Sequence, residues 1–256
     1  MKPPKISIVI PSYNKAGFIR KTLESIFVQN YKNLEVLIQD GGSTDGTTEI
    51  IKKFARKYPI IWESRKDKGQ LDAVNIGLKK ATGEILTFIN ADDCYEQNAF
   101  TIVSKAYLKN SKALWLVGRG MVVNENGQEI VKLVTWYKNL LLFLNSRFLL
   151  LVTNYVMQPS VFFTRLAYEK YGPFTGTPDF ITEYDFWLKL GKISMPAVLN
   201  ITISQFRIEP TTKTKTMSGK LLSADWEIIN RYTKNPIVLI LHKLNNWGRI
   251  LVEKFV

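Results

Sequence analysis

The first third of the chain alternates short apolar runs with segments whose apolar residues are spaced as on one face of a helix. The apolar runs are Ile6–Ile10, Leu34–Ile38, Ile60–Glu63 and Ile85–Ile89. Runs rich in Ile, Val and Leu are typical of strands that are buried on both faces of a parallel sheet. The repeated strand–helix–strand pattern therefore predicts an α/β protein with right-handed crossover connections.

Size and cysteine content narrow the class further. The chain has 256 residues, 46% of them hydrophobic, which is enough to fill the core of one large domain. The one cysteine, Cys94, excludes an internal disulfide framework. Residues Met1–Lys5 lead directly into the first apolar run and lack the apolar core of a secretory signal. We therefore expect a cytoplasmic location, which includes the inner face of the cell membrane.

The charge balance favours an anionic partner. There are 35 basic and 22 acidic residues, for a net charge of +13. The sequence has no zinc-finger spacing, no basic-region heptads and no aromatic RNA-binding signature, so we do not expect nucleic acid as a partner. A non-catalytic basic module that binds nucleic acid or anionic lipid nevertheless stays open as an alternative to an enzyme.

The apolar run Ile85–Ile89 leads into two adjacent carboxylates, Asp92 and Asp93. Ligands of parallel sheets bind beyond the carboxyl ends of the strands, so this pair should lie at the mouth of a cleft. Carboxylate oxygens there can hold Mg or Mn bridged to a substrate phosphate. The alternative is a solvated turn that only ends the strand.

Two further polar loops follow apolar runs. Asp40–Thr47 contains three glycines and matches neither a dinucleotide fingerprint nor a phosphate loop, so its other interpretation is a turn that caps a helix at Ser43 or Thr44. Arg65–Gln70 carries basic side chains that can face a diphosphate or simply form a solvated turn.

Four motifs in this order resemble the amino-terminal half of family 2 glycosyltransferases. They are Ser7–Asn14, Asp40–Thr47, Asp67–Asn75 and Phe88–Asp93. The resemblance continues more weakly to Pro210. It implies the GT-A fold, in which a Rossmann-like nucleotide-binding half is part of a mixed central sheet with helices on both faces. It also implies a nucleotide-diphosphate sugar donor of the UDP, GDP or dTDP type and a divalent metal, Mn or Mg.

The resemblance also assigns roles to individual residues. Asp93 is expected to ligate the metal, and Asp92 to lie near the ribose of the donor. Contacts to the donor nucleotide or its pocket are implied for Pro11, Tyr13, Asn14, Asp40, Asp67, Gln70, Asp72 and Asn75.

Two acids ahead of the apolar segment Phe186–Leu190 are candidates for the catalytic base. In similar family members the base lies two residues before the Asp that leads this helix, which maps onto Glu183, with Asp185 as the second candidate. Inverting transfer needs such a base on the face opposite the leaving diphosphate. The other interpretation is that both carboxylates only stabilise the start of a helix.

One residue departs from the family pattern. The segment Phe206–Pro210 is similar to the family's Arg-x-His-Pro motif, but Glu209 stands in place of the histidine. Glu209 is expected either to ligate the metal or to mark a lost contact.

The remaining segments are less diagnostic. Met121–Val131 is expected to form a strand, a turn and a second strand. Leu140–Val152 is too short to cross a bilayer and contains Arg147, so it fits an amphipathic surface helix, a wall of the acceptor site or a core helix. The basic, aromatic tail from Asn235 can lie in a membrane interface, pack on the core or form a dimer contact. His242, in this tail, is expected to be a surface or packing residue rather than a ligand.

These features together predict an organisation and a function. Residues 1–215 should form the GT-A domain, with a donor-binding half at 1–110 and an acceptor half at 111–215, and residues 216–256 a helical extension. The chain is expected to be a metal-dependent inverting glycosyltransferase that acts on a saccharide or lipid-linked acceptor in polysaccharide or glycolipid synthesis, with peripheral membrane contact among its expected partners. Sugar transfer onto a polyprenyl phosphate is the enzymatic alternative, and the oligomeric state is open.

Overall fold

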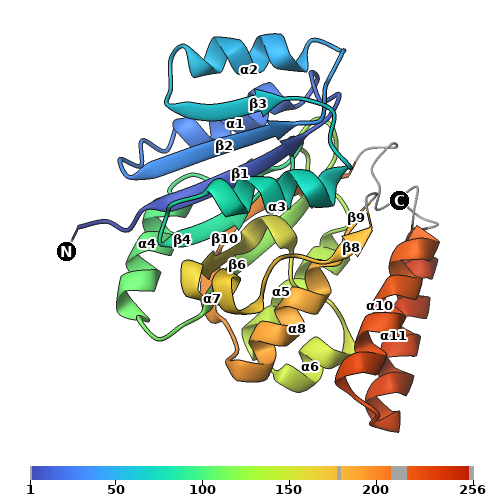
Figure 1. The fold of residues 1–256 in the computed structure, drawn as a ribbon. Coiled ribbons are helices and arrows are strands. Elements are labelled where there is room, and N and C mark those ends of the chain that lie inside the picture. The colour runs from blue at the N-terminus through green and yellow to red at the C-terminus, as the bar shows by residue number, and fades with distance from the viewer. Residues whose placement is uncertain (1, 178–179, 209–217, 254–256) are drawn as a thin grey trace.

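The computed structural model describes residues 2–177, 180–208 and 218–253. Within these ranges, eight strands form one sheet in the order β3-β2-β1-β4-β7-β6-β10-β5 (Figure 1). Two short strands, β8 (Gly176–Thr177) and β9 (Phe180–Ile181), pair separately. The two halves of the large sheet are built differently.

The first half is the predicted strand–helix repeat. Its strands are β1 (Ile6–Ser12), β2 (Leu34–Asp40), β3 (Ile60–Ser64) and β4 (Ile85–Phe88), and each pairs in parallel with its neighbour. Helices α1 (Ile19–Phe27), α2 (Thr47–Ala55) and α3 (Gln70–Lys80) connect them. Because the four strands run in the same direction, their carboxyl ends lie along one edge.

The second half makes the sheet mixed. It contains β5 (Cys94–Tyr95), α4 (Ala99–Lys109), β6 (Trp115–Val123), α5 (Lys132–Leu144), α6 (Arg147–Val152), the short 3-10 helix η1 (Gln158–Ser160), β7 (Val161–Thr164), α7 (Arg165–Tyr171), α8 (Glu183–Ile193) and β10 (Ala197–Arg207). Strand β7 is antiparallel to both β4 and β6, whereas β10 is parallel to β6. The expected mixed sheet is confirmed.

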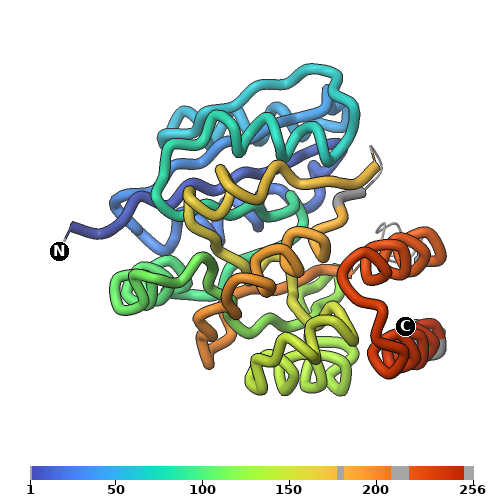
Figure 2. Tube along the Cα trace, turned by 60° about the horizontal axis from the view of Figure 1, so that its bottom comes forward, coloured from blue at the N-terminus to red at the C-terminus, as the bar shows by residue number. Residues whose placement is uncertain are grey.

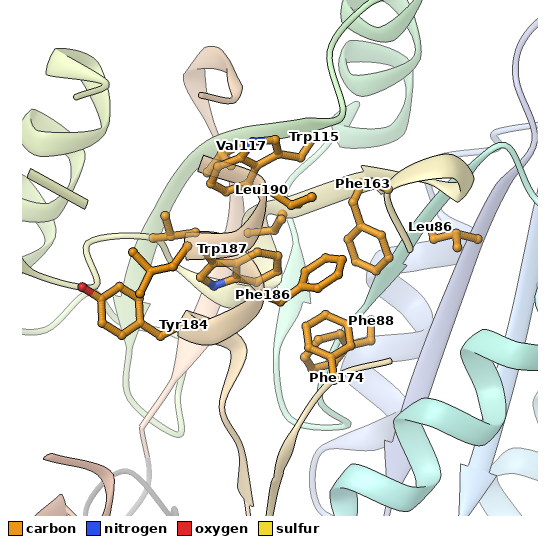
Figure 3. Close-up of a cluster of buried hydrophobic side chains, with 14 of the residues drawn as sticks. Leu86, Phe88, Trp115, Val117, Phe163, Phe174, Tyr184, Phe186, Trp187 and Leu190 are labelled. Atoms are coloured by element: carbon orange, nitrogen blue, oxygen red, sulfur yellow. The ribbon is translucent and has the colours of Figure 1, made fainter. Parts of the chain in front are cut away.

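Helices cover both faces of the sheet, because successive side chains of a strand point to opposite sides. On β1, Ile6, Ile8 and Ile10 pack with α1, α2 and α4, whereas Val9 packs with α3. The second face also carries a large aromatic cluster in which residues of α8 pack on β4, β6 and β7 (Figure 3). Among its pairs, Trp115 and Trp187 stack with ring centroids 5.8 Å apart.

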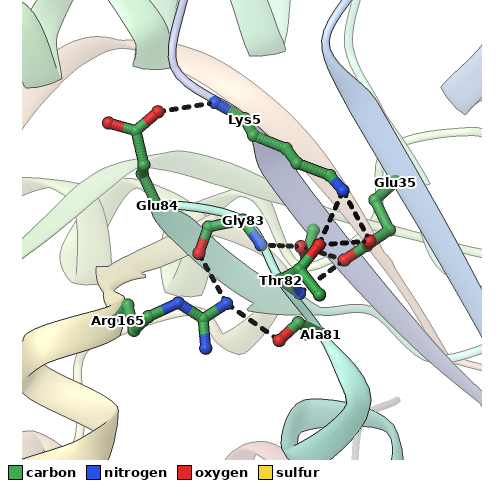
Figure 4. Close-up of polar contacts among 8 residues, drawn as sticks. Lys5, Glu35, Ala81, Thr82, Gly83, Glu84 and Arg165 are labelled. Atoms are coloured by element: carbon green, nitrogen blue, oxygen red, sulfur yellow. Dashed lines mark hydrogen bonds and ion pairs between the residues drawn. The ribbon is translucent and has the colours of Figure 1, made fainter.

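A polar network closes the opposite, amino-terminal edge of the parallel strands (Figure 4). Glu35 accepts hydrogen bonds from Lys5 Nζ at 2.7 Å, Ser7 Oγ at 2.5 Å and Thr82 N at 2.7 Å. Burial alone would raise the pKa of Glu35, but these hydrogen bonds outweigh it and lower the pKa to about 2. Arg165 of α7 joins the network by donating to the carbonyls of Ala81 and Gly83.

The chain ends in two helices, α10 (Ser218–Tyr232) and α11 (Pro236–Glu253), that lie against α6 and α8 (Figures 1 and 2). His242 of α11 is buried, and its Nδ1 lies 2.9 Å from the Val152 carbonyl oxygen. Its ring stacks on Tyr184 of α8. His242 therefore packs, as expected, and one face of α11 belongs to the core. No helix among the described residues is long and apolar enough to span a membrane.

Two local predictions were wrong. Helix α2 is not capped by Ser43 or Thr44: it begins at Thr47, whose backbone N–H and hydroxyl both donate to Asp45. The expected hairpin at Met121–Val131 has its turn, but the returning side pairs only through one bridge between Val123 and Glu129.

Candidate active site

Polar residues gather where β1, β2 and β4 end, at the carboxyl edge of the parallel strands. Pro11 is buried within β1, and Tyr13, just beyond it, has a side chain that is 62% exposed. Asn14 joins this loop to the one after β2: its backbone N–H donates to Ser43 Oγ at 2.8 Å, and its side-chain oxygen accepts from Thr44 N at 2.9 Å. The structure therefore brings these candidates together at the predicted edge.

Asp40 organises the loop after β2. Its buried carboxylate accepts hydrogen bonds from Gly42 N at 3.1 Å, from Ser43 N at 2.9 Å and from the hydroxyls of Ser43 and Ser64. Four donors on one carboxylate fix the path of the loop and hold β3 beside it.

Asp67, Gln70 and Asp72 shape the start of α3. Asp67 accepts from Gly69 N at 2.8 Å, and Asp72 accepts from Lys68 N at 3.2 Å. The carboxylate of Asp67 lies so close to Gly41 that a Cβ there would meet its oxygens at 3.1 and 3.2 Å. Glycine at position 41 thus lets the two loops meet.

A chain of hydrogen bonds leads from α3 to the acid pair. Gln70 Nε2 donates to Asn90 Oδ1 at 2.7 Å, and Asn90 Nδ2 donates to Asp93 Oδ2 at 3.2 Å. Asn75, one turn further along α3, does something else: it exchanges two hydrogen bonds with the backbone of Phe174. Its side chain holds the segment that leads to α8.

Asp92 and Asp93 are both buried. Asp93 Oδ1 accepts from Arg207 N at 2.8 Å, and Asp92 forms an ion pair with Lys15 at 2.7 Å. Burial and the neighbouring charge of Asp92 raise the pKa of Asp93 well above its ordinary value. Asp93 therefore holds its proton more readily than an exposed carboxyl group does.

Arg207 is a structural part of this site to which the sequence assigned no role. Its buried guanidinium donates to the carbonyls of Asp92, Asn124 and Glu125 at 2.7 to 2.8 Å. It therefore fixes the backbone of the acid pair against the turn after β6. The sequence feature that could have revealed Arg207 is the family motif at Phe206–Pro210, which contains it but was considered only for Glu209. Glu209 lies outside the described residues.

Glu183 and Asp185 occupy the first turn of α8 in different environments. Asp185 is held by Lys189 at 2.8 Å, by the hydroxyl of Tyr232 at 2.9 Å and by Thr175 at 3.3 Å. These partners outweigh burial and lower its pKa. Asp185 therefore fastens α8 to α10 as a carboxylate.

Glu183 is in the opposite situation. Burial raises its pKa from 4.5 to about 7; the negative charge of Asp225 on α10 adds to the effect, and the ammonium of Lys138 on α5 opposes it. Burial also disfavours the charged form of Lys138 and lowers its pKa from 10.5 to about 8. Asp225 forms an ion pair with Arg249 of α11 at 2.8 Å. We call Glu183, Lys138, Asp225 and Arg249 the α8 charge cluster.

Aromatic side chains connect α8 to the end of β4 (Figure 3). Phe174 packs edge-on against Phe88, with ring centroids 5.3 Å apart, and against Phe186 at 4.6 Å. Phe88 is the last residue of β4, and Phe186 lies in the first turns of α8. The helix that carries Glu183 is thereby packed, through Phe174, on the strand that leads to Asp93.

Comparison with known proteins identifies the family. A family model described as glycosyl transferase family 2 matches residues 7–172. The chain belongs to this family. The structure of this family 2 chain is similar to that of a mannosyltransferase, PcManGT from Pyrobaculum calidifontis, solved in complex with GDP-Man and Mn²⁺. The TM-score is 0.70 at 20% sequence identity, and the match covers 94% of this chain and 69% of that one. This likeness confirms the GT-A fold.

Two curated relatives show how far the similarity in sequence extends. The Escherichia coli UDP-Glc:alpha-D-GlcNAc-diphosphoundecaprenol beta-1,3-glucosyltransferase WfgD is 25% identical over 245 residues, 94% of this chain and 91% of that protein. Glycosyltransferase GlyA of Streptococcus pneumoniae serotype 4 is 38% identical over 95 residues, 37% of this chain. The family 2 chain spans 14% of GlyA and from 16 to 21% of three similar rickettsial glycosyltransferases.

Proposed function

We propose that this chain transfers a sugar, with inversion, from a nucleotide-diphosphate donor to a hydroxyl group of a saccharide or lipid-linked acceptor in cell-surface glycan synthesis. The observation that carries the proposal is Glu183 at the start of α8, whose pKa of about 7 suits a general base near neutral pH. The similarity to WfgD across nearly the whole chain supports a UDP-sugar donor and a polyprenyl-diphosphate-linked acceptor. We also propose that the reaction takes place in the cytoplasm, at the inner face of the membrane.

The donor side rests on the loops at the carboxyl edge. The exposed Tyr13 ring is free to lie against the nucleoside, and the loops fixed by Asn14, Asp40 and Asp67 supply a rigid floor. Asp92 and the chain from Gln70 to Asp93 then lie beneath the diphosphate end of the donor.

Asp92 and Asp93 fit a divalent cation. They are hard oxygen donors that lie side by side, and burial together with the charge of Asp92 raises the pKa of Asp93 even though Arg207 lies beside it. Among the described residues there is no group of three or more His, Cys, Asp or Glu that could hold a metal, so the remaining ligands would come from the substrate and water. When bound, Mn or Mg supplies positive charge to the leaving diphosphate. Glu209 stays a predicted additional ligand.

The protein's own step is a proton transfer. The acceptor hydroxyl gives its proton to the Glu183 carboxylate as its oxygen bonds to the anomeric carbon. The bond between that carbon and the diphosphate oxygen breaks at the same time, and the nucleoside diphosphate leaves with the electron pair. Asp185, bound by Lys189 and Tyr232, keeps α8 in place rather than taking the proton.

The test is release of UDP from UDP-glucose with Mn and a polyprenyl-diphosphate-linked sugar as acceptor. Asp93→Asn and Glu183→Gln should both lose transfer while remaining folded, and Glu169→Gln, at an exposed position of α7, should not. Near wild-type turnover by both variants would refute the assignment. Transfer to polyprenyl phosphate that is insensitive to Glu183→Gln would select the enzymatic alternative, because a phosphate oxygen needs little help from a base.

A further inference from the structure

Helix α5 presents an apolar face to solvent. Leu133, Trp136, Leu140, Phe143 and Leu144 are three or four positions apart and share one side of the helix, where their side chains are 38 to 82% exposed. The opposite side of α5 packs against the rest of the protein, where Thr135, Leu141 and Leu142 are buried. The helix is thus already packed on the protein, and its outer face is apolar as well.

Helix α11 repeats this arrangement. Ile237, Ile240, Leu244 and Trp247 lie on one side and are 58 to 67% exposed. His242 and Val238 on the other side are buried. The two helices meet where Asn245 donates to the hydroxyl of Tyr137 at 2.9 Å, and α11 also packs on α6, whose Phe148 is 45% exposed. We call these outward sides of α5, α6 and α11 the α5–α11 face (Figure 2).

A groove continues the apolar surface between α10 and α11. It has a volume of about 700 Å³ and is lined by Leu222, Trp226, Leu244, Trp247 and Ile250, together with polar residues that include Lys243. The Lys243 ammonium lies 4.5 Å from the centre of the Trp226 ring, so a positive charge stands over one of the aromatic rings that line the groove.

The charges of the three helices are almost all positive. Their exposed basic residues are Lys132, Arg147 and Lys243, whereas Lys138 and Arg249 point toward Glu183 and Asp225. The one acid of these helices is Glu253, and Glu227 of α10 lines the groove. A contact between two copies of this face would bring cations against cations, which opposes association. An anionic bilayer offers both complements at once: phosphate groups for the cations and acyl chains for the Trp, Leu and Phe side chains.

We propose that the α5–α11 face docks on the surface of an anionic lipid bilayer, with its aromatic and leucine side chains in the interface and the exposed Lys132, Arg147 and Lys243 at the phosphates. The groove between α10 and α11 then receives apolar chain from the lipid. The contact is peripheral, and it does not depend on the proposed reaction. It places the helices that carry Lys138 and Arg249 of the α8 charge cluster next to the lipid.

The experiment is co-sedimentation of the whole chain with vesicles of phosphatidylcholine and phosphatidylglycerol at 3:1, compared with phosphatidylcholine alone. We expect binding to the mixed vesicles that weakens in high salt and is much weaker without phosphatidylglycerol. Trp136→Ser with Trp247→Ser should lower the partition coefficient about tenfold or more. Val28→Ser with Leu166→Ser is the matched control, because these side chains are 66% and 61% exposed on other surfaces.

Charge is tested separately. Lys243→Glu should weaken binding about fivefold or more, whereas Lys57→Glu, which changes the same charge beside the ring of Tyr58, should not. Equal binding to both kinds of vesicle, or equal losses in face and control variants, would overturn the proposal. A dimer in sedimentation equilibrium that Trp136→Ser and Trp247→Ser dissolve, without vesicle binding, would assign the face to a second copy instead. Binding is read without substrate, so its failure is distinct from failure of the proposed reaction.

Discussion

Replacing Glu183 by glutamine should stabilise the protein at alkaline pH while it abolishes sugar transfer. The folded protein raises the pKa of Glu183 from 4.5 to about 7, so between these values the folded state holds a proton that the unfolded chain has lost. Stability therefore falls as pH rises through this window, and the loss is complete above about pH 7. Converted at about 1.4 kcal/mol for each pH unit, the difference amounts to about 3 kcal/mol.

Glutamine has nearly the same shape and no charge, so it avoids this loss. Urea denaturation followed by tryptophan fluorescence should give Glu183→Gln a free energy of unfolding up to about 3 kcal/mol above wild type at pH 8. The difference should nearly vanish at pH 4.5, where the wild-type carboxyl is neutral in the folded state. The exposed Glu169→Gln should change stability by about 0.5 kcal/mol or less at both pH values. A gain that is independent of pH, or a loss at pH 8, would refute the buried environment of Glu183.

Three further outcomes follow from the same site. Lys138→Met should move the acidic limb of kcat/KM to higher pH, because it removes a positive charge that lowers the pKa of Glu183, and Asp225→Asn should move it to lower pH. Asp93→Asn should lower turnover of the nucleotide sugar about 100- to 1,000-fold with saturating Mn, with an unchanged circular dichroism spectrum, and EDTA should have a similar effect on the wild type. Arg207→Ala should destabilise the protein by about 3 kcal/mol in urea denaturation, because it leaves the buried carbonyl of Asp92 and the partly buried carbonyls of Asn124 and Glu125 without their donor.

Each of these three predictions has a result that would contradict it. Shifts of the pH limb in the same direction for Lys138→Met and Asp225→Asn would mean that neither charge acts on Glu183. Full activity of Asp93→Asn would remove the acid pair from the reaction. Arg231→Ala, at a side chain that is 61% exposed, serves as the control for Arg207→Ala, and equal effects would show that burial of Arg207 is not the cause.

The parallel half of the fold could be predicted from sequence because its strands are buried on both faces, so each one appears in the sequence as a continuous apolar run. The positions of Asp92 and Asp93 followed from the same logic, since they come after the apolar run of β4. Asp40, the last residue of β2, was assigned to the donor by the family resemblance. The contacts of Arg207 could not be predicted: its guanidinium meets carbonyl groups more than 80 residues away in sequence, and backbone carbonyls leave no residue-specific signal. Asn75 was placed with the nucleotide contacts by its motif, yet its amide is paired with the backbone of Phe174.

The fastening of α8 to α10 through Asp185 has a consequence for engineering. The hydroxyl of Tyr232 on α10 donates to this carboxylate, while the charge of Asp225, on the same helix, acts on the neighbouring Glu183. Deleting the last two helices to obtain a shorter fragment would remove the contact of Tyr232 with Asp185 and the charge of Asp225 near Glu183, and would leave α8 held only by its packing on the rest of the protein. Shortened versions of this protein should therefore be judged by their turnover and pH profile rather than by solubility alone.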